Sequence, residues 1–434
     1  MVQQMRSGLR AIGRLFTGRA RYARAVKVAL EVQKSYRVFA ARRGEFESDE
    51  ARDAALHAVH HENARKVTNL CRRNGATWIK LAQVMSCRPD LLPRIYIEEL
   101  RELQNDAPPV DFGELEPVLA EQYGEGWESR FAKFDRKPIA TASIAQVHRA
   151  TTADGIDVAV KIQLPDVRRL FRQDFAFFSM IANLLAPFYP QVDIRQVARK
   201  WLEMTRAELD LRTEAENLVT FAAHPHNPKI RFPRLVAELS GERVLVTTWV
   251  EGVRLREYLD SHNELAREHL TLLLDSYIQQ IMSFGIYHAD PHPGNFIIND
   301  AGEIAILDFG ALDRITPQEA IHYGALLLTL FRRTDQDLKA AFERAGFSGL
   351  DSDTIRHLSK VFLGAKGKDS SEMLASALDT LQQHRVTIPD SFVSLARVLI
   401  TVGGFMQTYR VKVNLDKALM IHVSNSVARS AAQA

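Results

Sequence analysis

Two short polar motifs in the second half of the chain constrain its fold more than any other feature. The first reads His-Ala-Asp-Pro-His-Pro-Gly-Asn over residues 288–295, and the second is the Asp-Phe-Gly that begins at Asp308. Asn295 follows Asp290 by 5 residues, and Asp308 follows Asn295 by 13. We therefore expect a tight loop that carries Asp290 and Asn295, flanked by short strands, with Asp308 at the end of an apolar strand.

These residue types, in this order, suit phosphoryl transfer. That reaction needs positioned phosphates, neutralised charge and a carboxylate aimed at the acceptor. Asn295 and Asp308 are predicted to bind Mg²⁺, which prefers hard oxygen ligands. Asp290 is predicted to orient or deprotonate a hydroxyl or a water. The two spacings match those of the catalytic Asp, the metal-binding Asn and the Asp-Phe-Gly Asp of protein kinases, so ATP and Mg²⁺ are the predicted cofactors.

Two other interpretations of the first motif stay open. His288, Asp290 and His292 could be polar residues that cap the loop. The same three residues could instead bind a transition metal in a hydrolase. Pro291 and Pro293 constrain that loop, however, and no further His/Cys cluster completes a ligand set.

An alternating segment upstream, Val-Ala-Val-Lys at 158–161, predicts a strand that presents Lys161 to the α- and β-phosphates. Residues 148–152 and 156–161 are expected to pair as a hairpin across Ala-Asp-Gly at 153–155. A strand lysine that faces inward is unusual unless an anion binds there. Lys161 is therefore predicted to act in catalysis by binding phosphate.

A phosphate-binding lysine needs a carboxylate to orient it, and a long helix is expected to supply one. The helical pattern runs from Val197 to about Phe221, and Asp210 and Glu214, four residues apart, are expected on one face of it. A further strand is expected over 243–249. The adenine is expected against the backbone just after this strand, near Trp249, Val250 and Glu251.

Together these motifs resemble the UbiB family of atypical kinases, the AarF-type proteins, from about Asn74 to Leu415. The family's Lys-x-Gly-Gln motif corresponds to residues 80–83, where Ala82 replaces the glycine. Its alanine-rich nucleotide loop corresponds to Ala140, Thr141, Ala142 and Ser143, where Thr141 interrupts the alanine run. Its Glu-x-Asp motif falls on Glu208 and Asp210, and its lysine partner falls on Glu214.

The resemblance implies an α+β, two-lobed protein-kinase-like fold with a helical N-terminal extension and a mainly helical C-lobe. Lys80 and Gln83 would gate the cleft beside Glu208 and Asp210 and exclude protein substrates. The expected activity is that of an ATPase or kinase that supports ubiquinone or other isoprenoid-lipid metabolism. The expected domains are a basic segment 1–50, a helical extension 51–110, an N-lobe 111–250 and a C-lobe 251–434.

The N-terminus is strongly basic. Residues 1–43 hold eleven Lys/Arg and one acid, a net charge of +10, whereas the whole chain carries +3. On a helical wheel, apolar and arginine side chains separate, which predicts a helix on an anionic bilayer. A disordered arm, a helix packed on the body and an organelle-targeting peptide stay open. The two faces consist of Met5, Leu9, Ile12 and Phe16, and of Arg6, Arg10 and Arg14.

Other sequence features limit the compartment and the partners. Cys71 and Cys87 cannot form a disulfide framework, and no apolar run reaches the ~20 residues of a membrane span. A cytoplasmic protein with peripheral membrane contact through residues 1–43 is expected. Its expected partners are ATP and an anionic or isoprenoid lipid, without nucleic acid, and a homodimer stays open. The C-terminal helices, including 389–406, are assigned no chemistry.

Two alternative functions remain. The chain could be a nucleotide-binding scaffold with little turnover. It could also be a small-molecule kinase of the aminoglycoside- or choline-kinase type, which shares the two motifs but does not explain residues 80–83 or the Glu-x-Asp pair.

Overall fold

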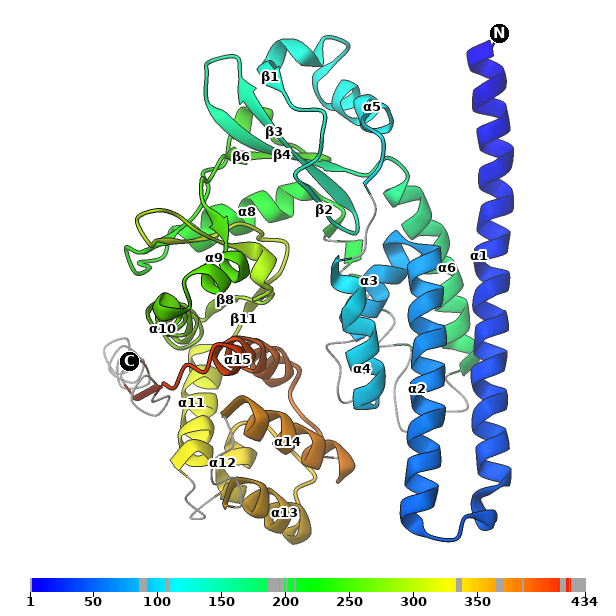
Figure 1. The fold of residues 1–434 in the computed structure, drawn as a ribbon, viewed down its shortest axis with the longest axis vertical. Coiled ribbons are helices and arrows are strands. Elements are labelled where there is room, and N and C mark those ends of the chain that lie inside the picture. Colours follow the sequence, from blue (N-terminus) through cyan, green and yellow to red (C-terminus); the bar gives the residue numbers. More distant parts are fainter. Residues whose placement is uncertain are drawn as a thin grey trace. The chain divides into compact units, whose positions relative to one another are not determined.

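The computed structural model divides into two compact units, which are described separately (Figure 1). The first comprises residues 1–127, 135–148 and 161–209, and the second comprises 128–134, 149–160 and 210–434. The structure describes the chain except for residues 1, 86–91, 106–108, 186–194, 196–198, 200, 201, 204, 207, 333–337, 364–369, 385, 414–418, 421 and 423–434.

The first unit is built mainly from helices. They are α1 (Val2–Ala41), α2 (Asp49–Asn74), α3 (Ala76–Met85), α4 (Arg94–Arg101), α5 (Phe112–Tyr123) and α6 (Val167–Leu185). Helices α1 and α2 lie side by side as a hairpin (Figure 1). Ser48 caps α2 by accepting a hydrogen bond from the Ala51 amide at 3.1 Å, and Gly75 ends it with φ +68°.

Helix α1 bears on the N-terminal prediction in two ways. The helical pattern expected in residues 1–50 is confirmed from Val2 to Ala41, where α1 ends. The side chains of residues 2–19, on which the two predicted faces depend, lie outside the described part of the structure. From residue 21 onward α1 packs against other helices of the first unit. Arg21 pairs with fully buried Asp174 of α6 at 2.8 Å, and the ring of Tyr22 stacks on Phe177 at 4.5 Å.

The predicted hairpin belongs to a five-stranded sheet. Its order is β1 (Phe131–Phe134), β3 (Ala145–Thr152), β4 (Asp157–Gln163) and β6 (Val244–Thr248), and β2 (Ala140–Thr141) pairs with β3. The expected hairpin is confirmed. In its turn Gly155 has φ +87°, and the Thr152 amide donates to the Ile156 carbonyl at 2.9 Å.

The second unit combines short strands with a large helical core. Its strands are β5 (Ile230–Arg231), β7 (Val253–Arg254), β8 (Ile286–His288), β9 (Phe296–Ile298), β10 (Ile304–Ile306) and β11 (Leu312–Arg314). Its helices are α8 (Leu211–Ala222), α9 (Leu255–Ser261), α10 (Ala266–Gln279), α11 (Pro317–Arg332), α12 (Leu338–Arg344), α13 (Ser352–Leu363), α14 (Ser370–Gln383) and α15 (Asp390–Thr408). Antiparallel pairs β9–β10 and β8–β11 position the two polar motifs.

The predicted helix over 197–221 is wrong at one point. The described residues from 195 to 208 are helical, but the helix ends before Asp210 and a new one, α8, begins at Leu211. Asp210 has an extended backbone, with φ −114° and ψ 102°, and its carboxylate accepts a hydrogen bond from the Arg212 amide at 3.0 Å. Aspartate favours this capping position because it satisfies an amide that the helix leaves unpaired. Asp210 and Glu214 therefore do not share the face of one continuous helix.

Helix α15 confirms the helix expected over 389–406. Among the described residues it is the one helix that is long and apolar enough to cross a membrane, by length and composition only. Core helices meet the same criteria, and Leu395, Ala396, Val398 and Val402 of α15 are fully buried in the core of the second unit.

Candidate active site

The loop after β8 brings Asp290 and Asn295 together. The side-chain amide of Asn295 donates to the backbone carbonyl of Asp290 at 3.0 Å and to its carboxylate at 3.1 Å. Pro293 starts a single 3₁₀ turn, which His292 caps by accepting a hydrogen bond from the Gly294 amide at 3.1 Å. The proline fixes φ where no amide donor is needed. The amide NH₂ of Asn295 is thus directed at Asp290, and its carbonyl oxygen remains as an acceptor.

The β9–β10 hairpin brings Asp308 to the same end of the loop. Phe296 pairs with Ile306, and the Leu307 amide donates to the Asn295 carbonyl at 3.0 Å. The carboxylate of Asp308 accepts a hydrogen bond from the Gly310 amide at 2.9 Å. A Cβ atom on Gly310 would lie 3.1 Å from Asp308 Oδ1 and 3.9 Å from Glu214 Oε2. Glycine at this position therefore permits a close approach of both carboxylates to the backbone.

Glu214 reaches this region from the first turn of α8 and is 7% exposed. The same helix contributes Asn217, whose side-chain amide donates to the Phe309 carbonyl at 3.0 Å. Helix α8 therefore supports the Asp-Phe-Gly segment on one side while it presents the buried carboxylate of Glu214 there.

Fully buried His288 connects the two motifs. Its Nε2 donates to the backbone carbonyl of Asp308, and its Nδ1 accepts from the Tyr277 hydroxyl at 3.3 Å. Burial lowers the pKa of His288 and outweighs the opposing effect of Asp290 and Asp308. The imidazole is therefore neutral. Both ring nitrogens hold protein hydrogen bonds, which disfavours the transition-metal interpretation of this motif.

Helix α15 also supports the loop, which the sequence analysis missed. The guanidinium of Arg397 donates to the Ala289 carbonyl at 2.7 Å, and Ser394 hydrogen bonds to Asp313 on β11. Arg397 lies 108 residues from Ala289, so no local pattern could have identified it. We therefore assign α15 a positioning role in place of simple packing.

The predicted adenine contact, residues 249–251, follows β6 in the second unit. The Trp249 amide donates to the Asp157 carbonyl at 2.8 Å. The guanidinium of Arg149 lies 4.5 Å from the Trp249 ring and pairs with both Asp157 and Glu251 at 2.8 Å. Among the hydrogen bonds of the described residues, none uses the backbone of Val250. The edge of an adenine base forms hydrogen bonds with backbone N–H and C=O groups that have no other partner, as these groups of Val250 do among the described residues.

The first unit holds the other predicted site residues except Asp210, which belongs to the second unit. Lys161 follows the buried side chains of Val158 and Val160 on β4 and points to the opposite face of the strand. The alanine-rich loop forms the β2–β3 turn, in which the Ala142 amide donates to the Ala145 carbonyl at 2.8 Å. Ala140 and Thr141 form β2, and Ser143 lies within the turn.

An ion pair joins the Lys-x-Ala-Gln motif to the Glu-x-Asp motif. Lys80 of α3 forms an ion pair with Glu208, and the two side chains are 20% and 19% exposed. The side chain of Gln83 lies outside the described part of the structure. Asp210 pairs with Arg212 at 2.7 Å in addition to capping α8.

Residues 102–342, more than half of the chain, match the ABC1 atypical kinase-like domain. The chain belongs to the ABC1 atypical kinase-like family. This family assignment and the kinase-like fold confirm the expected resemblance to the UbiB (AarF-type) proteins. The match includes Lys161, Glu214 and both polar motifs of this ABC1 protein, whereas Lys80 precedes it.

Similar proteins carry kinase names. Protein ACTIVITY OF BC1 COMPLEX KINASE 1, chloroplastic, of Arabidopsis thaliana is 29% identical over 363 residues, which cover 80% of this chain and 53% of the relative. AarF domain-containing protein kinase 1 of Xenopus tropicalis is 30% identical over 296 residues, 66% of this chain and 57% of the relative. The ABC1 protein thus spans little more than half the length of these two relatives.

A solved structure is also similar. It is the complex of Rv3197 with erythromycin from Mycobacterium tuberculosis, which is 28% identical to this ABC1 protein. It matches with a TM-score of 0.59 over 77% of this chain and 89% of that one.

Proposed function

We propose that this ABC1 protein is an ATP- and Mg²⁺-dependent atypical kinase or ATPase. The observation that carries the proposal is the placement of Asp290, Asn295 and Asp308 at one end of the β9–β10 hairpin. This set offers the hard oxygen atoms that Mg²⁺ prefers. The hydrogen bonds from Asn295 to Asp290 leave the Asn295 carbonyl oxygen as an acceptor, so the donor set fits the cation.

Each proposed role follows from the chemistry of its residue. Lys161 binds the α- and β-phosphates, and Glu214 orients Lys161. Asn295 and Asp308 hold Mg²⁺, which neutralises phosphate charge when it is bound. The adenine binds along residues 249–251, and the loop 140–143 covers the phosphates. The Lys80–Glu208 pair gates access to the site, together with Gln83 and Asp210.

Asp290 serves the acceptor. It accepts the proton of a hydroxyl or a water as the acceptor oxygen bonds to the γ-phosphorus, while the bond from that phosphorus to the leaving ADP oxygen breaks. Its side chain is exposed, as a group that meets an incoming acceptor must be. His288 takes no part in this proton transfer, because its Nε2–H is bonded to the Asp308 carbonyl, and it acts by positioning the Asp308 backbone.

A matched pair of variants tests the proposal. Asp308→Asn should abolish Mg²⁺-dependent ATP hydrolysis, because the amide removes the charge that attracts the cation. Asp300→Asn makes the same substitution on an exposed turn of the β9–β10 hairpin and should leave turnover unchanged. Unchanged turnover in Asp308→Asn would contradict the assignment. Nucleotide binding without any turnover in the wild type, even with anionic lipid, would favour the scaffold alternative.

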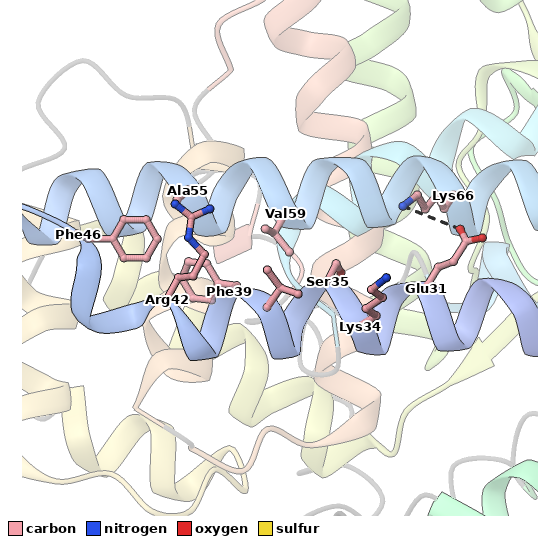
Figure 2. A pocket seen from close by; sticks show the side chains of 10 residues that line it. Glu31, Lys34, Ser35, Phe39, Arg42, Phe46, Ala55, Val59 and Lys66 are labelled. Carbon is pink, nitrogen blue, oxygen red and sulfur yellow. Dashed lines mark ion pairs between the residues drawn. The ribbon is translucent and has the colours of Figure 1, made fainter.

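We further propose that the acceptor or regulator is an isoprenoid lipid or an anionic lipid that the protein meets at a membrane surface in the cytoplasm. A pocket of about 400 Å³ near the α1–α2 turn supports this (Figure 2). Its wall is mainly apolar and includes Phe39, Phe46, Ala55 and Val59. The pocket is also lined by three basic residues, Lys34, Arg42 and Lys66, and by one acid, Glu31. A lipid with an apolar chain and an anionic headgroup is therefore complementary to this pocket.

Vesicle co-sedimentation tests the lipid proposal independently of turnover. Ala55→Trp fills the pocket and should weaken binding to phosphatidylglycerol vesicles, whereas Ala58→Trp, on an exposed face of the same helix, should not. Lys34→Glu should also weaken binding, with exposed Lys339→Glu on α12 of the second unit as its control. Equal binding by Ala55→Trp and wild type would contradict a role for this pocket.

A further inference from the structure

A cluster of metal-ligating side chains lies in the second unit, apart from the two polar motifs. Asp353 and His357 belong to α13, and His384 directly follows α14. One ligand atom from each residue lies within 4.8 Å of the other two. The two imidazole rings are 4.9 Å apart between centroids and inclined by 45°. Among the described residues, this is the one such group of three.

Local structure prepares two of these side chains. Asp353 and His357 are four residues apart and share one face of α13. His357 Nδ1 donates to the Asp353 backbone carbonyl at 2.9 Å, which fixes the tautomer and leaves the lone pair of Nε2 available. Metal-binding histidines use this arrangement, in which the second nitrogen donates to a carbonyl or a carboxylate. Neither ring nitrogen of His384 has a hydrogen-bond partner among the described residues.

We propose that Asp353, His357 and His384 form a Zn²⁺ site with a fourth position open to water. Two imidazoles and one carboxylate suit Zn²⁺, whereas Mg²⁺ and Ca²⁺ prefer sets made only of oxygen atoms. The metal would tie the first half of α13 to the end of α14. Zn²⁺ binding should therefore stabilise this pair of helices.

Within the described residues, Arg356 brings a positive charge to the cluster. Arg356 pairs with Asp353 Oδ1 at 3.1 Å, and its side chain is 65% exposed. An exposed pair of this kind contributes little free energy, so a cation can displace it. Removing Arg356 should therefore leave Zn²⁺ binding intact or strengthen it. A site formed by nonspecific attraction to surface charge would show no dependence on the two histidines.

Calorimetric titration of the full chain with Zn²⁺, in excess Mg²⁺, tests the proposal. The wild type should bind one tight Zn²⁺ and gain thermal stability. His357→Ala and His384→Ala should each lose roughly tenfold or more in affinity, because loss of even a supporting group costs about 10- to 100-fold. His322→Ala, on α11 outside the cluster, is the matched control and should bind like wild type.

Two further variants separate this site from the proposed ATP site. Asp308→Asn should keep its Zn²⁺ affinity even where ATP hydrolysis is lost, and Arg356→Ala should bind at least as tightly as wild type. Circular dichroism of each variant confirms folding. Wild type without a tight Zn²⁺, or His357→Ala and His384→Ala with unchanged affinity, would overturn the proposal.

Discussion

The imidazole of His288 donates a hydrogen bond from Nε2 to the backbone carbonyl of Asp308. This bond joins the two polar motifs at a fully buried position, and the Tyr277 hydroxyl holds the other ring nitrogen. The position of Asp308 therefore depends on a side chain that itself need not touch nucleotide or metal.

We expect His288→Gln to raise the Mg²⁺ concentration needed for half-maximal ATP hydrolysis. Glutamine carries its donor and its acceptor on one terminal carbon, so it cannot keep both hydrogen bonds, and Asp308 is held less firmly. A charged partner typically makes a hydrogen bond of about 1.5–3 kcal/mol, and this neutral one should be weaker, about 0.5–1.5 kcal/mol. The Mg²⁺ concentration needed for half-maximal hydrolysis should then rise roughly 2- to 12-fold at saturating ATP. Unchanged Mg²⁺ dependence would exclude a positioning role.

Stability should fall as the pH drops below neutrality. Burial lowers the pKa of His148, His226 and His288 in the folded protein. Between the lowered pKa and the unfolded value of about 6.5, the unfolded chain binds protons that the native state does not. The free energy of unfolding should therefore decrease from about pH 7 downward, by at most about 1.4 kcal/mol per pH unit for each histidine.

Urea unfolding at several pH values measures this slope. His288→Gln should reduce the slope below pH 7, because one of the titrating groups is gone. A steeper loss of stability in His288→Gln, or a stability that rises on acidification through this range, would contradict the buried neutral state of these rings.

Arg397→Met should lower the rate of ATP hydrolysis through the loop that carries Asp290. It removes the bond from Arg397 to the Ala289 carbonyl, next to Asp290. We expect kcat to fall roughly tenfold with a smaller change in ATP affinity, because Ala289 adjoins Asp290, which serves the acceptor, whereas the proposed Mg²⁺ ligand Asn295 lies at the other end of the loop. Arg344→Met is the matched control, since exposed Arg344 donates to the Ala340 carbonyl of its own helix and has no other hydrogen bond within the described part of the chain. Equal rates for both variants would refute the role of α15.

Arg21→Ala should destabilise the first unit by about 3–5 kcal/mol, because it leaves the charge of Asp174 buried without its partner. Arg21 and Asp174 side chains are 8% and 0% exposed. Chemical denaturation should detect the loss, and Lys27→Ala, which removes a highly exposed cation of the same helix, should change stability little.

Deleting residues 1–43 would remove Arg21 too, so the proposed membrane role of the N-terminus is better tested by deleting residues 1–19.

The sequence predicted those parts of the site that short loops determine. Asp290, Asn295 and Asp308 fall within one strand hairpin and its two flanking turns, so their spacing fixes their neighbourhood. The turn at Gly155 was predictable for the same reason. Contacts between distant segments were not, as Arg397 on the Ala289 carbonyl shows. The break before Asp210 was missed because helix periodicity continues across it, while the capping preference of aspartate prevails locally.

We propose that Lys161, Glu214, Asn295 and Asp308 act on one nucleotide. A crystal structure of the protein with Mg²⁺ and a non-hydrolysable ATP analogue tests it most directly. We predict that Lys161 Nζ contacts the α- or β-phosphate and that Asn295 and Asp308 bind the Mg²⁺. A nucleotide bound elsewhere, or Lys161 turned away from phosphates that Asp308 and its cation hold, would contradict the account.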